Sequence, residues 1–208
     1  MQTLLTGFGA FERVVSNPTE RLVRYFEENG APGHALTVRV LPVSYESAGQ
    51  QMRAEMEIGG KQGKPFDCVL MLGVASGCKE WRVERIGWNS NEAVRPDAFG
   101  RMPSAMIAPH LPESLLSTLP HTLIAEAIRR EGFPVVESDS AGRYLCNYVL
   151  FSALAEAQKR SSAARIGFLH VPADEQTFAQ NITSAPSYPF AQHILAVRAA
   201  LNALHPTT

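Results

Sequence analysis

The 208-residue sequence has almost no net charge and no long hydrophobic run. Nineteen basic and twenty acidic residues give a net charge of −1, without the basic stripe that follows a phosphate backbone, which argues against nucleic acid as a partner. No run approaches the ~20 apolar residues of a membrane span, and the first residues lack the positively charged start and apolar stretch of a signal peptide. We therefore expect a cytoplasmic protein that does not bind membranes.

Cysteines are also few: Cys68, Cys78 and Cys146. They are odd in number, form no Cys-x-x-Cys pair and have no histidine at the spacing of a zinc site, so we expect neither a structural disulfide nor a metal. Gly7-Phe8-Gly9 resembles the start of a dinucleotide-binding loop, but Glu12 takes the place of the third glycine, and its carboxylate would repel a pyrophosphate. The sequence thus predicts no cofactor.

Apolar residues make up 45% of the sequence, enough for one sizeable core, and we expect a single domain over residues 1–208. Short β-rich runs alternate with longer helical patterns. The predicted strands are Thr3 to Thr6, Leu36 to Leu41, Cys68 to Leu72, Val135 to Glu137 and Arg165 to Val171. The predicted helices are Thr19 to Asn29, Ser44 to Ile58, Thr122 to Glu131, Arg143 to Lys159 and Phe190 to Leu204. This alternation is typical of an α/β three-layer sandwich, in which helices cover both faces of a mostly parallel, twisted sheet.

Two stretches do not follow the alternation. Residues Glu80 to Trp88 alternate between charged and apolar side chains, which is typical of a half-exposed antiparallel strand. Residues Asn89 to Pro120 contain five prolines among small residues and predict a long irregular loop. Such a loop within a compact domain is more often functional than inert.

The strongest chemical signal comes from Cys146 and His170. A helical apolar pattern begins just past Gly142 and places Cys146 in or near a first helical turn, where unpaired N–H groups and the helix dipole favour the thiolate. His170 interrupts an apolar run at the carboxyl end of a predicted buried strand, where α/β folds place their sites. The imidazole could activate the thiol. Alternatively, Cys146 is a small buried hydrophobe, the commonest role of a cysteine on an apolar helix.

Other candidate residues also have two interpretations. Glu84 is either a solvated charge beside an arginine or a carboxylate that orients an imidazole and favours the imidazolium. Phe8 and Phe11 are either ordinary core residues or the walls of a small apolar pocket. We expect Cys68 in the core, and the remaining histidines at the surface: His34, His110, His121, His193 and His205.

Together these segments resemble the pyroglutamyl peptidases, cysteine exopeptidases that remove an N-terminal pyroglutamate, over most of the chain. The four motifs that carry the resemblance are, in order, Thr6-Gly7-Phe8-x-x-Phe11 with Asn17-Pro18-Thr19, Glu84-Arg85-Ile86 with Asn89, Ala141-Gly142 through Leu145-Cys146-Asn147, and Gly167-Phe168-x-His170-Val171-Pro172 with Glu175-Gln176. The resemblance implies a phosphorylase/hydrolase-like α/β fold and no cofactor.

The resemblance also implies the residues of the site. Cys146 is the implied nucleophile, His170 the general base and acid, and Glu84 the third catalytic residue. The implied substrate pocket grips a lactam between aromatic and backbone groups, at the positions of Phe8, Phe11, Asn17, Val74, Tyr144 and Leu145.

The chain departs from the family pattern in three places. Glu12-Arg13 stands where the family usually has two glycines, and Ser76-Gly77-Cys78 stands in place of Gly-Gly-Arg. At Val94-Arg95 the family's order of a basic and then an apolar residue is inverted. The family's arginine can support the thiolate and the oxyanion, and in this chain either Arg95 takes over that role after a small shift of the loop or the role is lost.

We therefore interpret the sequence as a cysteine exopeptidase that hydrolyses the bond after an N-terminal pyroglutamyl residue through a thioester acyl-enzyme. Its expected partners are N-terminally pyroglutamylated peptides, and a homo-oligomer is compatible with this interpretation. The alternative is a non-catalytic small-ligand or nucleoside-binding protein on the same fold, because a fold alone does not fix a function.

Overall fold

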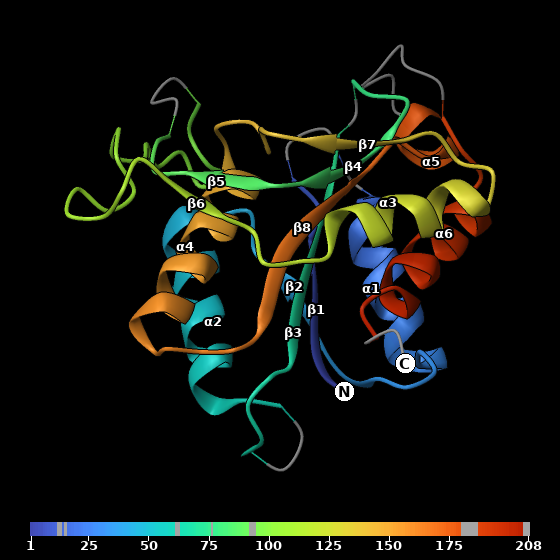
Figure 1. Ribbon diagram of the computed structural model, residues 1–208. Coiled ribbons are helices and arrows are strands. Elements are labelled where there is room, and N and C mark those ends of the chain that lie inside the picture. Colours follow the sequence, from blue (N-terminus) through green and yellow to red (C-terminus); the bar gives the residue numbers. More distant parts are fainter. Residues whose placement is uncertain are drawn as a thin grey trace.

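The computed structural model describes residues 1–11, 14, 16–60, 63–75, 77–91, 95–179 and 187–205. A six-stranded sheet lies at its centre, in the order β2-β1-β3-β8-β4-β7 (Figure 1). Four strands run parallel: β1 (Gln2–Phe8), β2 (Ala35–Leu41), β3 (Cys68–Val74) and β8 (Arg165–Val171). Two run the opposite way: β4 (Trp81–Glu84) and β7 (Val135–Ser138). The predicted mostly parallel sheet is confirmed.

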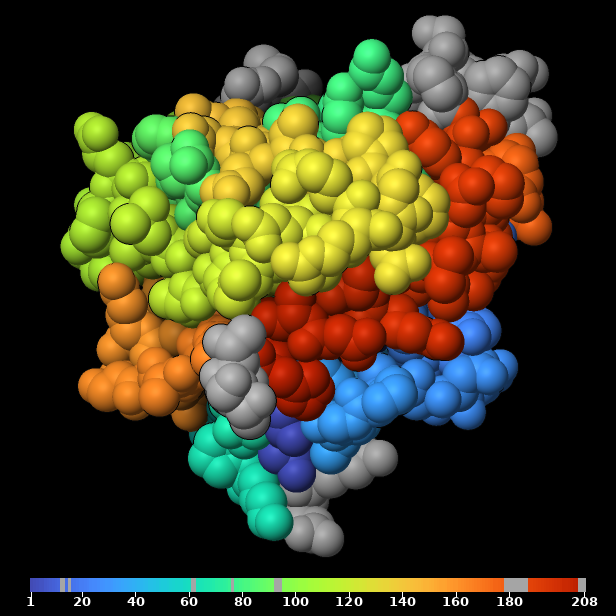
Figure 2. Space-filling model, turned by 45° about the vertical axis from the view of Figure 1, so that its right-hand side comes forward, coloured from blue at the N-terminus to red at the C-terminus, as the bar shows by residue number. Residues whose placement is uncertain are grey.

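Helices cover both faces of the sheet, as predicted for a three-layer sandwich. One face carries α2 (Tyr45–Ile58) and α4 (Leu145–Lys159). The other carries α1 (Pro18–Asn29), α3 (His121–Arg130) and α6 (Phe190–Asn202). Figure 2 shows α3 (yellow) beside α6 (red), with α1 (blue) below them. None of the helices in the described ranges is long and apolar enough to cross a membrane.

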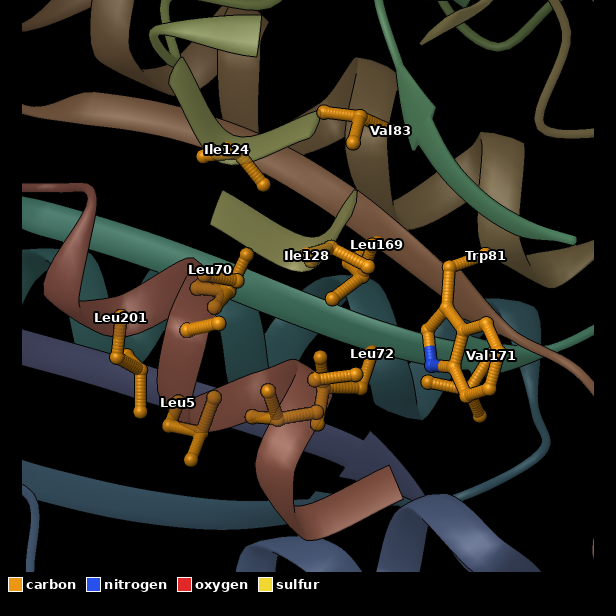
Figure 3. Packing of buried hydrophobic residues seen from close by; sticks show 14 of the residues in the cluster. Leu5, Leu70, Leu72, Trp81, Val83, Ile124, Ile128, Leu169, Val171 and Leu201 are labelled. Atoms are coloured by element: carbon orange, nitrogen blue, oxygen red, sulfur yellow. The ribbon is translucent and has the colours of Figure 1, made fainter. Parts of the chain in front are cut away.

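The core consists of two apolar layers, one on each face of the sheet. In β3, Leu70 and Leu72 belong to the layer under α1, α3 and α6, while Val69 and Met71 belong to the layer under α2 and α4. Figure 3 shows the first layer, in which Leu70 and Leu72 lie with residues of α3, α6 and β8. A strand buried on both faces reads as a continuous apolar run, which explains why β3 was predicted from sequence.

The predicted alternating strands and helices are all present, with bounds that differ by no more than two residues at either end. The predicted half-exposed strand over Glu80 to Trp88 is wrong. It is divided into β4 and β5 (Ile86–Trp88), and Trp81, Val83 and Glu84 are buried because β4 lies between β8 and β7. Only its antiparallel pairing with β8 agrees with the prediction.

Two further elements were absent from the prediction. The irregular segment 89–120 contains β6 (Ser114–Leu116), which pairs with β5 in a small second sheet. A short helix, α5 (Glu175–Ala179), follows β8.

Histidine burial also differs from the prediction. His193 was expected at the surface but is fully buried, with its ring 5.2 Å from that of Trp81, and burial lowers its pKa to about 4. The expectation of a surface residue failed because His193 lies on the face of α6 that packs against the sheet. Cys68 is in the core, as predicted.

Candidate active site

Cys146 is the second residue of α4. The helix starts after Gly142, whose φ of +76° lies in the left-handed region that favours glycine. Tyr144 occupies the N-cap position, and no side chain of the described residues caps this first turn by a hydrogen bond. The predicted position of Cys146 at a helix N-terminus is therefore confirmed, and the partial positive charge of that terminus is available to an anion.

His170 and Glu84 form a buried pair across two adjacent strands. Nδ1 of His170 on β8 donates to Oε1 of Glu84 on β4 at 2.8 Å. Glu84 is fully buried and His170 is 6% exposed. Glu84 is thus not a solvated charge, and the alternative interpretation of an orienting carboxylate agrees with the geometry. β4 and β7 lie at the upper end of β8 in Figure 1, at the edge where the parallel strands end.

Cys146 lies on the other side of the His170 ring. Burial by itself lowers the pKa of His170, but the charge of Cys146 and hydrogen bonds with Cys146 and Glu84 outweigh it and raise the pKa above its ordinary value. A raised pKa means that the imidazolium persists at pH values where an ordinary histidine is neutral. The three residues thus lie in a row, Cys146–His170–Glu84, that stabilises a protonated histidine.

Gly73 completes the surroundings of the thiol, although it was not among the site residues predicted from the sequence. It lies opposite His170 in the β3–β8 pairing. A Cβ at this position would be 2.9 Å from Sγ of Cys146 and 2.6 Å from Cζ of Phe168. The β3 backbone therefore approaches the nucleophile more closely than any side chain would permit. A glycine inside an otherwise apolar strand is the signal that could have indicated this approach.

The predicted aromatic residues and Cys146 share one apolar layer. Phe8 and Leu145 belong to the apolar layer under α2 and α4, and Phe11, Tyr144 and Cys146 pack against it. Phe8 is only 5% exposed, whereas Phe11 and Tyr144 are half-buried. The structure thus brings these five predicted residues to the same face of the sheet.

Asn17 is engaged within the chain. Its Oδ1 accepts from the N–H and the hydroxyl of Thr19 and caps α1, and its Nδ2 donates to the Gly9 carbonyl at 3.0 Å. The Thr19 hydroxyl in turn accepts from the Phe8 N–H at 3.0 Å. Asn17 therefore fixes the turn after β1, and its contribution to the site runs through the position of Phe8.

Val74 ends β3 directly after Gly73 and is half-buried. The guanidinium of the exposed Arg95 lies 4.5 Å from the centre of the Tyr144 ring, and the Tyr144 hydroxyl donates to the Pro96 carbonyl at 3.1 Å. The contact described for Arg95 is with this ring, beside the predicted pocket. Of the other residues at which the chain departs from the family pattern, Gly77 and Cys78 are described, whereas Glu12, Arg13, Ser76 and Val94 lie outside the described residues.

Asn147 is a second residue that sequence reasoning left without a role. It is fully buried next to Cys146. Its Oδ1 accepts from the Trp88 N–H at 2.8 Å, and its Nδ2 donates to the carbonyls of Trp88 and Ser90 at 2.9 and 3.0 Å. These bonds attach the first turn of α4 to β5. An asparagine inside an apolar helix was the available signal, because a buried amide requires partners.

This arrangement is suited to acyl transfer. It combines a thiol at a helix N-terminus, an imidazole that can be protonated and a carboxylate that orients the imidazole. The N–H groups at the start of α4 are the donors nearest in sequence to the thiol, and such groups stabilise the oxyanion of a tetrahedral intermediate. The described residues contain no group of three or more His, Cys, Asp or Glu that could hold a metal ion.

Comparisons with known proteins agree with this chemistry. The family model described as pyroglutamyl peptidase matches residues 1–206. The pyrrolidone-carboxylate peptidase of Thermococcus litoralis is 36% identical over 172 residues, which cover 82% of this chain and 76% of that protein. The Pyrococcus furiosus pyrrolidone-carboxylate peptidase is 31% identical over 206 residues, which cover 97% of each chain. The solved pyrrolidone carboxyl peptidase structure from T. litoralis superposes with a TM-score of 0.87 at 32% identity, over 98% of this chain and 92% of that one.

Proposed function

Because the chain belongs to the pyroglutamyl peptidase family, we propose that it hydrolyses the bond after an N-terminal pyroglutamyl residue of peptides with Cys146, His170 and Glu84 as its catalytic residues. The observation that carries the proposal is the row of these three side chains, in which Glu84 accepts from His170 at 2.8 Å and His170 bonds to Cys146. The alternative of a non-catalytic binding protein is not favoured, since the relatives are peptidases.

The first half of the reaction forms a thioester. The Cys146 thiolate attacks the pyroglutamyl carbonyl carbon, a C–S bond forms, and the carbonyl electrons move to an oxyanion that the N–H groups at the start of α4 stabilise. The intermediate then collapses, the C–N bond breaks, and the His170 imidazolium gives its proton to the departing amine. Glu84 keeps the His170 ring oriented throughout.

The second half returns the enzyme to its starting state. Neutral His170 takes a proton from water, and the resulting nucleophile attacks the thioester carbonyl. The C–S bond breaks, pyroglutamate leaves, and the thiolate–imidazolium pair forms again. No redox step and no external proton donor is needed, because His170 alternates between acid and base.

The pocket has to recognise a neutral lactam. We assign its apolar walls to Phe8, Phe11, Tyr144 and Leu145, which belong to the same apolar layer as Cys146. We assign the recognition of the lactam N–H and carbonyl to backbone groups at Val74. We also include Arg95, which stacks on the Tyr144 ring, among the substrate-binding residues. Asn17 supports the pocket through the Phe8 turn.

Hydrolysis of pyroglutamyl-aminocoumarin tests the proposal. The wild-type protein should cleave it and should use prolyl-aminocoumarin ~10³–10⁴-fold less well, because the pocket's polar groups stay unpaired with a ring that lacks the lactam carbonyl. Cys146→Ala should abolish cleavage. Cys68→Ala, which removes a thiol from the core, should retain it. Residual turnover in Cys146→Ala above about a tenth of wild type would contradict the assignment of the nucleophile.

The proposal also covers the setting of the enzyme. We propose that residues 1–208 act as a single domain. We also propose that the protein is cytoplasmic, and the three free cysteines among the described residues support this location. A homo-oligomer remains compatible with the chain, and light scattering at working concentration will measure its mass.

A further inference from the structure

Arg82 lies beside the catalytic row, although neither the motifs nor the proposed mechanism assigns it a role. On β4 it is the residue that pairs with His170 of β8. Its Nε is 3.4 Å from Oε1 of Glu84, which is the same oxygen that accepts the His170 Nδ1–H. The guanidinium therefore contacts the carboxylate from which His170 takes its orientation.

Two further contacts fix the guanidinium of Arg82 next to Glu84. Its Nη2 donates to the hydroxyl of Ser138 on β7 at 2.7 Å, and its Nη1 is 4.0 Å from Sγ of Cys78. The Arg82 side chain is only 28% exposed. A planar guanidinium bound at two edges has little freedom, so its charge stays next to Glu84.

Glu84 needs such a partner. It is fully buried, and its second oxygen, Oε2, has no hydrogen-bond partner among the described residues. A buried carboxylate is unfavourable unless a charge of opposite sign compensates it. Once the thiolate–imidazolium pair has formed, Cys146, His170 and Glu84 together carry a net negative charge. Arg82 brings the charge of the row to zero.

We propose that Arg82 is a positioning residue of the catalytic row, which keeps the Glu84 carboxylate turned toward Nδ1 of His170. The proposal rests on the triad of the proposed function. Arg82 does not touch the reacting atoms in this account. It acts through Glu84, which in turn supports the imidazolium that protonates the leaving amine.

Few other charged groups face the row. Cys146 comes from α4 and His170 from β8, while Cys78 and Ser138 lie beside Arg82 from the turn after β3 and from β7. The nearest other charges of β7 and its following turn, Glu137 and Asp139, pair with Arg85. Arg85 therefore offers a matched control: an arginine three residues away whose charge is already paired.

The sign of the effect follows from charge alone. The active state of the row has a thiolate, an imidazolium and a carboxylate, which together hold one proton. Activity is lost at low pH when the row takes up a second proton, and at high pH when it loses the one that it holds. Loss of a neighbouring positive charge favours proton uptake and opposes proton loss. The rising and the falling limb of the profile of kcat/KM against pH should therefore both move to higher pH, by about one unit, in Arg82→Gln. A residue that serves only folding would lower activity without moving both limbs in this way.

The experiment measures the rate of iodoacetamide alkylation of Cys146 against pH by mass spectrometry, together with kcat/KM for pyroglutamyl-aminocoumarin. Arg82→Gln should move the acidic limb of the alkylation profile and both limbs of the kcat/KM profile to higher pH, Arg82→Lys should restore them, and Arg85→Gln should leave them in place. Ser138→Ala, which frees Arg82 from its hydroxyl partner, should give a smaller shift of the same sign. In a Glu84→Gln background, Arg82→Gln should change kcat/KM by less than about twofold, because coupled residues are not additive.

Two outcomes would overturn the proposal: limbs that do not move in Arg82→Gln, or an equal movement in Arg85→Gln. Alkylation requires no substrate, so this result is independent of which peptide the enzyme cleaves. If wild-type Cys146 shows no enhanced reactivity, the triad itself fails. If it does and the Arg82 variants match wild type, only the role of Arg82 fails.

Discussion

Gly73 leaves space for the nucleophile, and this makes it sensitive to the smallest substitution. In Gly73→Ala the new methyl group would meet Sγ of Cys146 at 2.9 Å and the Phe168 ring at 2.6 Å, so the thiol has to move. A displacement of about 1 Å at a reacting atom lowers rates by ~10²-fold, and we expect kcat/KM to fall by about that factor. Gly77→Ala is the control, since no atom that the structure describes, apart from the chain neighbours, lies within 4 Å of its added Cβ. Steady-state kinetics that show equal activity for the two variants would remove Gly73 from the site.

Glu84 acts on His170 by its charge, which predicts a pH effect with a defined sign. The pKa of His170 is raised in part by its hydrogen bond and attraction to Glu84. In Glu84→Gln this contribution is lost, the imidazolium deprotonates at lower pH, and the basic limb of kcat/KM should move down by about one pH unit. This shift is opposite in sign to the one expected for Arg82→Gln. A basic limb that stays in place in Glu84→Gln would show that the carboxylate does not support the imidazolium.

At the level of elements, Asn147 joins α4 to β5. Asn147→Ala leaves the N–H and carbonyl of Trp88 and the carbonyl of Ser90 without their partner, and each unpaired buried group costs about 1–3 kcal/mol. Because three groups lose their partner, we expect the free energy of unfolding to fall by at least about 3 kcal/mol in denaturant titration. Asn202→Ala, at the exposed end of α6, should change it by less than about 0.5 kcal/mol. Equal stability of the two variants would mean that the amide bonds contribute nothing.

The sequence predicted those elements best whose character is set by local pattern. β8 was predicted with its observed bounds from the short apolar run that ends at Pro172, and α4 was predicted from its apolar repeat. β4 and β6 were mispredicted or missed. Each is only three or four residues long, and its burial depends on partners distant in sequence, β7 and β8 for one and β5 for the other. Short strands of this kind carry too few residues for a periodic signal.

At the scale of the whole molecule, the fold assembles the site from segments spread over the entire chain. Phe8 ends β1, Glu84 ends β4, Cys146 is the second residue of α4 and His170 is the penultimate residue of β8, and all four were predicted because they belong to ordered motifs. Gly73, Arg82 and Asn147 were not among the predicted site residues. Their roles depend on which strand lies next to which helix, and in the sequence alone they read as a strand glycine, a charged residue and a helix amide.

The central claim is that Cys146 is an activated nucleophile in a pocket that recognises pyroglutamate. The most direct test is the rate at which iodoacetamide alkylates Cys146 at neutral pH, followed by mass spectrometry with pyroglutamate or proline present. We expect fast, single-site alkylation of Cys146, at a rate that matches the loss of activity. Pyroglutamate should slow this alkylation, and proline should not. Cys68, whose burial raises its pKa to about 12, should remain unmodified in the folded protein. If Cys146 reacts no faster than an ordinary exposed thiol, it is not an activated nucleophile. If pyroglutamate does not protect it, Cys146 does not lie in a pocket that recognises pyroglutamate.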